Sequence, residues 1–348
     1  MKLYRRLILA AFALAAAVIV FGAYVRLADA GLGCPDWPGC YGQLSPHHAQ
    51  ADILQTQGVD PHGPVSLPKA WKEMIHRYLA ASLGLLIVVI AGVAWRRRDR
   101  QGTAPGTATL LVGVVIFQGI LGKWTVTLLL KPAIVTAHLL GGLTTLALLA
   151  WLGLRAQRVA RLPVPPGVRA VARIGLALLV AQIVLGGWTS TNYASLACTD
   201  FPTCHGTFSP ATDYGNAFHV VRELGMTADG DFLPLPALTA IHWSHRLGAV
   251  VAGAALYLLA WLLARRQSTQ PLGLALLAAI TLQVALGIAN VVFGLPLALA
   301  VAHNAGAVLL VALLVSINYR VGPLRAEATV GRRKAAGRGK HEHQNSFA

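Results

Sequence analysis

The chain has 348 residues, of which 55% are hydrophobic and only 12% are charged, and its mean hydropathy is +0.59. Soluble domains average about 25% charged residues, so this composition excludes both an ordinary water-soluble enzyme and a disordered chain. It fits an all-α polytopic membrane protein. The formal net charge of +16 does not indicate nucleic-acid binding, because the basic residues lie in short clusters between apolar runs and form no continuous basic face.

Eight apolar segments are long enough to cross a bilayer as helices, which takes roughly 20 residues. In chain order they cover about 7–27, 71–94, 107–129, 132–153, 169–191, 237–263, 271–293 and 296–318. The first could also be a secretory signal peptide, because it follows a basic start and Ala28-Asp29-Ala30 resembles a cleavage site. Its apolar stretch is longer than the usual core of a signal peptide, so we expect a retained helix.

Clusters of lysine and arginine predict the orientation of these spans. They lie at 96–100, 155–173, 265–266 and 320–334. All fall on the same side as the N-terminus, which the positive-inside rule assigns to the cytoplasm. We expect a multi-pass protein of a bacterial inner membrane with both termini cytoplasmic. A basic disordered tail would cover 321–348, with His341 and His343 solvated, and two long outer loops would cover about 28–70 and 192–236.

The chain contains an internal duplication. Residues 22–46 align without gaps with residues 186–210, and ten of the 25 positions are identical. The identities include all of the cysteines, so that Cys34 and Cys40 match Cys198 and Cys204. The duplication therefore extends through the outer loops as well as the spans.

The same repeat continues further along the chain, where Gln118-x-x-Leu-Gly matches Gln283-x-x-Leu-Gly. Each half then has four spans and one long outer loop, and an even number of spans makes the two repeats parallel. We predict an N-terminal four-helix repeat over 1–160 and a C-terminal one over 161–320, arranged as two tandem parallel four-helix bundles.

Four histidines occupy equivalent places in the second and fourth span of each half: His76, His138, His245 and His303. Ionisable side chains inside a span are energetically expensive, so they are functional candidates by default. Counting from the span ends, all four lie about 8–12 Å deep in the outer leaflet. Two facing histidines in a bundle core can hold a b-type haem through both axial positions of the iron. For any single histidine, a hydrogen-bonded core residue is the alternative.

An arginine directly follows one of these histidines in each half, at Arg77 and Arg246. An arginine inside a membrane needs an anionic partner, and haem propionates near the outer surface would supply one. The alternative is an arginine that extends its side chain to the membrane interface.

The two halves differ one helical turn before the first histidine. Glu73 precedes His76 there, whereas His242 precedes His245. A carboxylate is not needed to hold a haem and could serve as an acid or base, although a simple ion pair with Arg77 is the alternative. The difference suggests that the first half performs chemistry and the second carries electrons. His242 is a weaker rival to His245 as an iron ligand.

The cysteine pairs share the spacing C-x5-C within turn-rich outer-loop sequence. The outer side of a bacterial membrane is oxidising, so disulfides can form there. Each pair could close a local disulfide, as a structural link or as a redox-active pair. A thioredoxin-like C-x-x-C is absent.

Taken together, the Glu73-x-x-His76-Arg77 motif, its counterpart at His245-Arg246, the fourth-span histidines and the doubled cysteine loop resemble the haem A synthase family. The resemblance covers roughly residues 5–320. It implies an enzyme that oxidises the C8 methyl group of haem O to the formyl group of haem A by successive hydroxylations, for use in terminal oxidases. It implies partners within the membrane: haem O, haem A, an electron donor or acceptor, haem O synthase and oxidase assembly factors.

The resemblance also implies roles for single residues. His76 and His138 would hold the substrate haem O, with Glu73 essential nearby. His245 and His303 would ligate a permanent haem B. Disulfides would join Cys34 to Cys40 and Cys198 to Cys204.

Two other functions also account for the four histidines. A di-haem cytochrome that only transfers electrons would give Glu73 no particular role. A haem carrier would usually have a tryptophan-rich outer segment, whereas Trp37 is the one tryptophan of the long loops away from the helix ends.

Overall fold

The computed structural model describes residues 1–322. The predicted disordered tail beyond residue 322, with His341 and His343, lies outside the described residues. Helices dominate the described part of the chain, which contains no β-strand and only three isolated β-bridges in the loops.

Eight of the helices in residues 1–322 are long and apolar enough to cross a membrane. They are α1 (Lys2–Leu27), α3 (Leu67–Arg96), α4 (Pro105–Thr127), α5 (Pro132–Gln157), α6 (Pro166–Thr191), α8 (Leu235–Ala264), α9 (Gln270–Val292) and α10 (Leu297–Val321). Each corresponds to one predicted span, which confirms the all-α, eight-span prediction. All except α1 and α10 carry a proline in the first two positions, where the missing N–H has no helical partner to lose.

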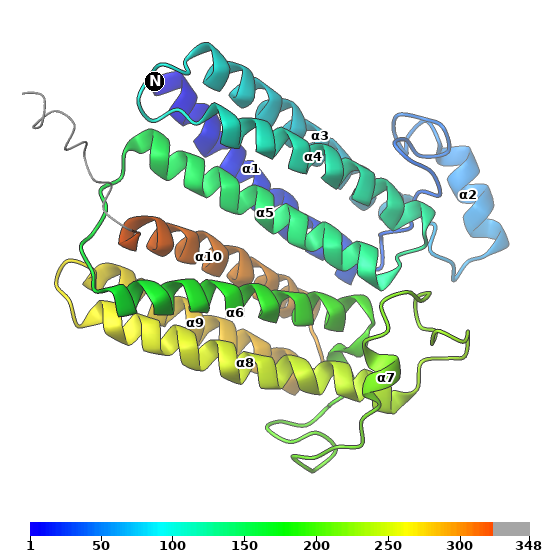
Figure 1. Ribbon diagram of the computed structural model, residues 1–348. Coiled ribbons are helices and arrows are strands. Elements are labelled where there is room, and N and C mark those ends of the chain that lie inside the picture. Colours follow the sequence, from blue (N-terminus) through cyan, green and yellow to red (C-terminus); the bar gives the residue numbers. More distant parts are fainter. Residues whose placement is uncertain (323–348) are drawn as a thin grey trace, which may run out of the picture.

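The loops contain short helices that the sequence did not predict. They are α2 (Gln50–Val59), the 3-10 turn η1 (Ala194–Leu196) and α7 (Tyr214–Ala217). In α2 only Ile53 is buried, so no apolar periodicity marks this helix in the sequence. Figure 1 places α2 and α7 at one end of the long helices and the N-terminus at the other.

The long helices pack in two groups (Figure 1). In the first group α1 and α4 each contact both α3 and α5, so α3 and α5 are diagonally opposite each other. In the second group α6 and α9 each contact both α8 and α10, and α8 and α10 form the corresponding diagonal. The groups meet where α10 packs against α1 and α5, and where α5 packs against α6. Each diagonal pair supplies the histidines described below.

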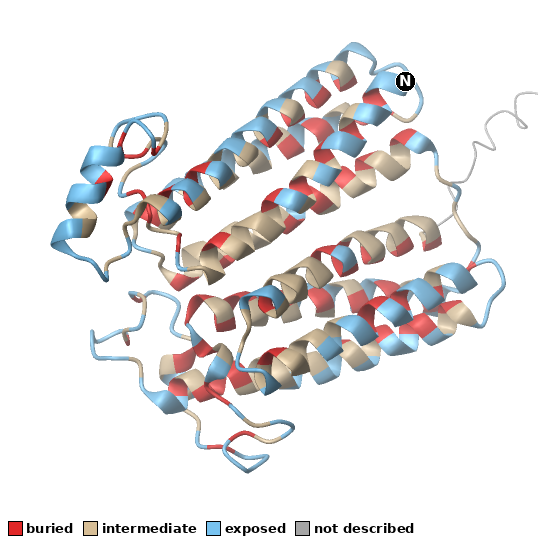
Figure 2. Ribbon diagram, turned by 180° about the vertical axis from the view of Figure 1, so that it is seen from behind, coloured by how far each residue is buried: buried red, intermediate tan, exposed pale blue. Residues whose placement is uncertain are grey.

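The tightly packed core lies toward the end that carries the N-terminus (Figure 2). Its fully buried side chains include Ile87, Leu149, Leu259 and Leu314. Nearer the cysteine loops the packing is looser: on α10, every residue from 301 to 307 is only half-buried, although Ala300 and Val308 on either side are buried. The inner surfaces of the helices therefore remain partly accessible over this part of their length.

Candidate functional site

The four histidines lie where the packing is loose, on the diagonal helices. In the first group His76 is on α3 and His138 on α5, so the two histidines occupy one diagonal of the group. In the second group His245 on α8 and His303 on α10 have the same relation. All four are half-buried although they sit among the helices. Two imidazoles thus face one interior from opposite corners of each group.

A glycine on the neighbouring helix borders each imidazole. A Cβ atom added to Gly22 would lie 2.8 Å from Cε1 of His76, and one added to Gly186 would lie 2.9 Å from Cε1 of His245. Gly122 and Gly287 border His138 and His303 in the same way, at 3.5 and 3.2 Å. At Gly22 and Gly186 a side chain could not be added without a shift of the imidazole, Gly287 is tight, and Gly122 is in ordinary contact with its histidine. These glycines were not predicted as site residues, although each pair occupies matching places in the repeat.

The ring nitrogens of the histidines are suited to a metal-bearing ligand. Nδ1 of His76, His138 and His303 is buried and finds no hydrogen-bond partner among residues 1–322. Nδ1 of His245 lies 3.0 Å from Nε2 of Gln182, a residue that the sequence analysis missed. Imidazole nitrogens on opposite helices, beside glycines and loosely packed space, match what bis-histidine haem ligation requires. The residues therefore fit a haem in each half.

Within residues 1–322, no group of three or more histidine, cysteine, aspartate or glutamate side chains could hold a metal ion. A porphyrin supplies four of the iron ligands itself, so two histidines complete its coordination.

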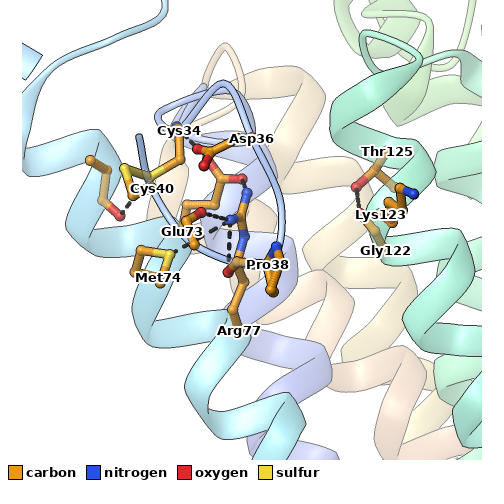
Figure 3. Close-up of polar contacts among 12 residues, drawn as sticks. Cys34, Asp36, Pro38, Cys40, Glu73, Met74, Arg77, Gly122, Lys123 and Thr125 are labelled. Atoms are coloured by element: carbon orange, nitrogen blue, oxygen red, sulfur yellow. Dashed lines mark hydrogen bonds and ion pairs between the residues drawn. A yellow bond between two sulfur atoms is a disulfide. The ribbon is translucent and has the colours of Figure 1, made fainter. Parts of the chain in front are cut away.

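Glu73 and Arg77 lie at the junction between α3 and the first cysteine loop (Figure 3). The buried Glu73 carboxylate accepts a hydrogen bond from the Cys34 N–H at 3.0 Å and pairs with Nη2 of Arg77 at 2.5 Å. Nη1 of Arg77 donates to the Pro38 carbonyl at 3.2 Å and to the carbonyl of Gly39. The pair therefore attaches the loop to the helix, one turn from His76.

His242 and Arg246 make the equivalent attachment in the second half. Nδ1 of His242 accepts from the Cys198 N–H at 3.2 Å, and Arg246 Nε lies 3.3 Å from His242 Nε2. Arg246 also donates to the carbonyls of Asp200 and Thr203, both at 2.8 Å. His242 lies in this loop attachment, whereas the ring of His245 is bordered by Gly186 like the other three histidines, so the geometry favours His245 as the iron ligand.

The hydrogen bonds of Glu73, Arg77 and Arg246 can be compared with the roles predicted for these residues from the sequence. The ion pair between Glu73 and Arg77 is present, next to a hydrogen bond that the sequence did not predict. The guanidinium groups of Arg77 and Arg246 bind loop carbonyls, and their contact with haem propionates stays a prediction. The acid/base role of Glu73 likewise stays a prediction.

The segments between the paired cysteines, 34–40 and 198–204, form two turns with the same local structure. Disulfides join Cys34 to Cys40 and Cys198 to Cys204, with Cα atoms 5.0 and 4.8 Å apart. In both turns an aspartate accepts two backbone N–H hydrogen bonds: Asp36 from Tyr41 and Gly42, and Asp200 from His205 and Gly206. Both turns also contain a cis X-Pro bond, at Pro38 and Pro202. The duplication thus extends to the detail of the loop backbone.

The second turn should resist acid. The Thr203 hydroxyl donates to Asp200 at 2.6 Å, and this bond together with the backbone N–H groups holds the Asp200 pKa well below its usual 3.8. Because the Asp200 pKa is lower in the folded turn than in the unfolded chain, its charge stabilises the turn at any pH above the unfolded-state pKa. This stabilisation is lost as the pH falls through the folded-state pKa. Amide hydrogen exchange of residues 198–207, corrected for intrinsic rate, should stay constant from neutral pH to about pH 4. Asp200→Ala should raise the exchange rate of these amides at neutral pH, whereas Asp231→Ala, at an exposed position, should leave it unchanged. Equal exchange rates in the wild type and in Asp200→Ala would contradict the stabilising role of Asp200.

Comparison with known proteins identifies the family. The model of the cytochrome oxidase assembly protein family (COX15-CtaA) matches residues 5–315. The chain belongs to this family. A heme A synthase of Shewanella oneidensis is 42% identical over 305 residues, covering 87% of this chain and 92% of that protein. Heme A synthases of Sphingopyxis alaskensis and Caulobacter vibrioides are 30% and 29% identical, each covering 88% of this chain and 88% and 92% of their own lengths.

Membership of the COX15-CtaA family confirms the resemblance that the sequence suggested. It also supports a protein that handles haem, and the eight long apolar helices of residues 1–322 support a multi-pass membrane protein. The family match covers both groups of helices, so it includes all four histidines.

Proposed function

We propose that the chain is an oxidoreductase that converts haem O to haem A, with the substrate between His76 and His138 and a permanent haem B between His245 and His303. Family membership and the similarity to heme A synthases support the reaction. The observation that carries the presence of two haem sites is the repeated diagonal histidine pair, each member bordered by a glycine. The overall change is oxidation of the C8 methyl group to a formyl group by successive hydroxylations.

The two halves, 1–160 and 161–320, divide the work because they differ next to the first histidine. Glu73 provides a carboxylate one turn from His76, and the second half has His242 in its place. In the first half the histidines orient the substrate, and Glu73 can hold or accept a proton near it. When bound, haem B supplies an electron-transfer centre in the second half.

The membrane orientation follows from charge. The basic clusters and both termini would face the cytoplasm, and the cysteine loops would face the oxidising outer side. Haem O and haem A are apolar enough to enter and leave through the lipid. The remaining partners would be an electron donor or acceptor, haem O synthase and oxidase assembly factors.

Expression in a host that makes haem O but no haem A tests the reaction. Haem extracted from the membranes and separated by chromatography should include haem A when the chain is present and an electron donor is available. Bound haem B with unchanged haem O would favour an electron-transfer cytochrome instead.

The glycine beside His245 offers a test of the haem B site. Gly186→Ala would place a methyl group against the imidazole, and over-packing of this kind costs about 1–3 kcal/mol. We expect the affinity for haem B to fall roughly 5- to 150-fold. Pyridine haemochrome spectra of the purified variant measure the bound haem. The control is Gly253→Ala on α8, where an added Cβ meets nothing within 4 Å; equal haem content in the two variants would contradict the assignment.

A further inference from the structure

A cavity of about 490 Å³ lies between the two groups of helices, at the end opposite the cysteine loops. Residues of α4, α5, α6 and α10 and of the segment between α5 and α6 line it. It is separate from the histidine sites, because its lining residue Trp151 lies 13 positions beyond His138 on α5, about 20 Å along the helix axis. The proposed function gives this cavity no role.

Three arginines line the cavity: Arg161, Arg169 and Arg173. Among residues 1–322 no acidic side chain lines the cavity, and no ion pair includes these arginines. Nε of Arg169 is buried and finds no partner in the described part of the chain. Arg161 donates to the Tyr319 carbonyl at 2.9 Å and Arg169 to the Val164 carbonyl at 3.1 Å, but neither guanidinium group has an anionic partner within residues 1–322. Arginines at a membrane end bind anions such as phosphate.

The other walls of the cavity are aromatic and apolar. Trp151 and Tyr319 meet edge to face with their ring centroids 6.4 Å apart, and Arg161 lies over the Tyr319 ring at 4.7 Å. Apolar side chains complete the lining, among them Leu148 and Leu176. Tryptophan and tyrosine are typical of the level of the lipid headgroups. The cavity thus combines cationic groups for a headgroup with an apolar surface for acyl chains.

We propose that this cavity binds the phosphodiester headgroup of an anionic phospholipid. Basic pockets between membrane helices, at the side that the positive-inside rule makes cytoplasmic, bind such headgroups. The arginines supply the positive charge that a phosphodiester needs. The apolar wall can contact the acyl chains of a lipid, which free phosphate does not have. A lipid held here would contact α5, α6 and α10, and so would link the two groups of helices at the seam where they meet.

Native mass spectrometry of the purified haem-loaded protein tests this site. After delipidation, the protein is mixed with cardiolipin or with phosphatidylcholine at equal concentration. We expect retained cardiolipin adducts and few phosphatidylcholine adducts. Arg169→Gln with Arg173→Gln should weaken cardiolipin retention about tenfold or more, because each basic residue near an anionic headgroup contributes to binding.

The matched control is Arg265→Gln with Arg266→Gln, which removes two exposed arginines just past the end of α8. It should leave cardiolipin retention unchanged. Haem content reports whether each variant is folded. If the double variant of Arg169 and Arg173 does not fold, Arg173→Gln alone is used to test the site. The Arg173 side chain is exposed and makes no hydrogen bond within residues 1–322, so its replacement should not affect folding.

Three results would overturn the proposal. Equal loss in both double variants would show that general charge, and not this cavity, retains the lipid. Equal retention of phosphatidylcholine would show that the headgroup charge is not recognised. Displacement of cardiolipin by inorganic phosphate at the same concentration would show a site for the free anion and not for a lipid.

Discussion

Glu73→Gln is expected to lower haem A formation by about 10²–10⁴-fold, the usual contribution of an acid/base group, while haem B stays bound in the second half. The amide still offers an oxygen to the Cys34 N–H, so the loop keeps one of its attachments to α3. It carries no charge and cannot transfer a proton. Chromatography of haem extracted from membranes that contain haem O measures both haems in one sample.

His242→Gln provides the matched control, because His242 makes the equivalent hydrogen bond to the Cys198 N–H without a carboxylate. We expect this variant to retain most of its haem A formation. If both variants lose it equally, loop attachment and not acid/base chemistry accounts for the effect of Glu73.

His303→Ala is expected to remove haem B from the purified protein almost completely. The substitution leaves only His245 on the iron, and bis-histidine ligation depends on both helices of the diagonal. Pyridine haemochrome spectra give the haem B bound per chain. Haem A formation should fail as well, because the electron-transfer centre is lost.

Two histidines outside the pair serve as controls for His303→Ala. His219 is exposed in the loop between α7 and α8, and His219→Ala should keep its haem B. His242→Ala should also keep it, because Nδ1 of His242 accepts from the Cys198 N–H and holds the loop, which leaves His245 as the ligand on α8. Loss of haem B in His242→Ala together with retention in His303→Ala would contradict the ligand assignment.

The long helices could be predicted from sequence because membrane spans follow from apolar length alone. The prediction for 132–153 begins at the first residue of α5, Pro132, and the prediction for 169–191 ends at the last residue of α6, Thr191. The repeat predicted which histidines correspond. It did so because duplicated segments keep their spacing even where most residues have changed.

Contacts between helices could not be predicted from the spacing of residues along the sequence. Nothing in the sequence shows that Gly22 faces His76, or that Gln182 reaches His245, because each contact joins residues more than 50 positions apart. The hydrogen bond from Cys34 to Glu73 likewise depends on how the loop folds back over α3. The short helix α2 was missed because a single buried residue leaves no periodic pattern.

The central claim is that the two histidine pairs hold different haems, and one comparison tests it directly. His76→Ala with His138→Ala, and separately His245→Ala with His303→Ala, would be purified from a host that makes haem O, and the haems bound to each would be separated by chromatography. We expect the first variant to keep haem B and form no haem A, and the second to lose haem B. Loss of haem B from the first variant and its retention in the second would contradict the account.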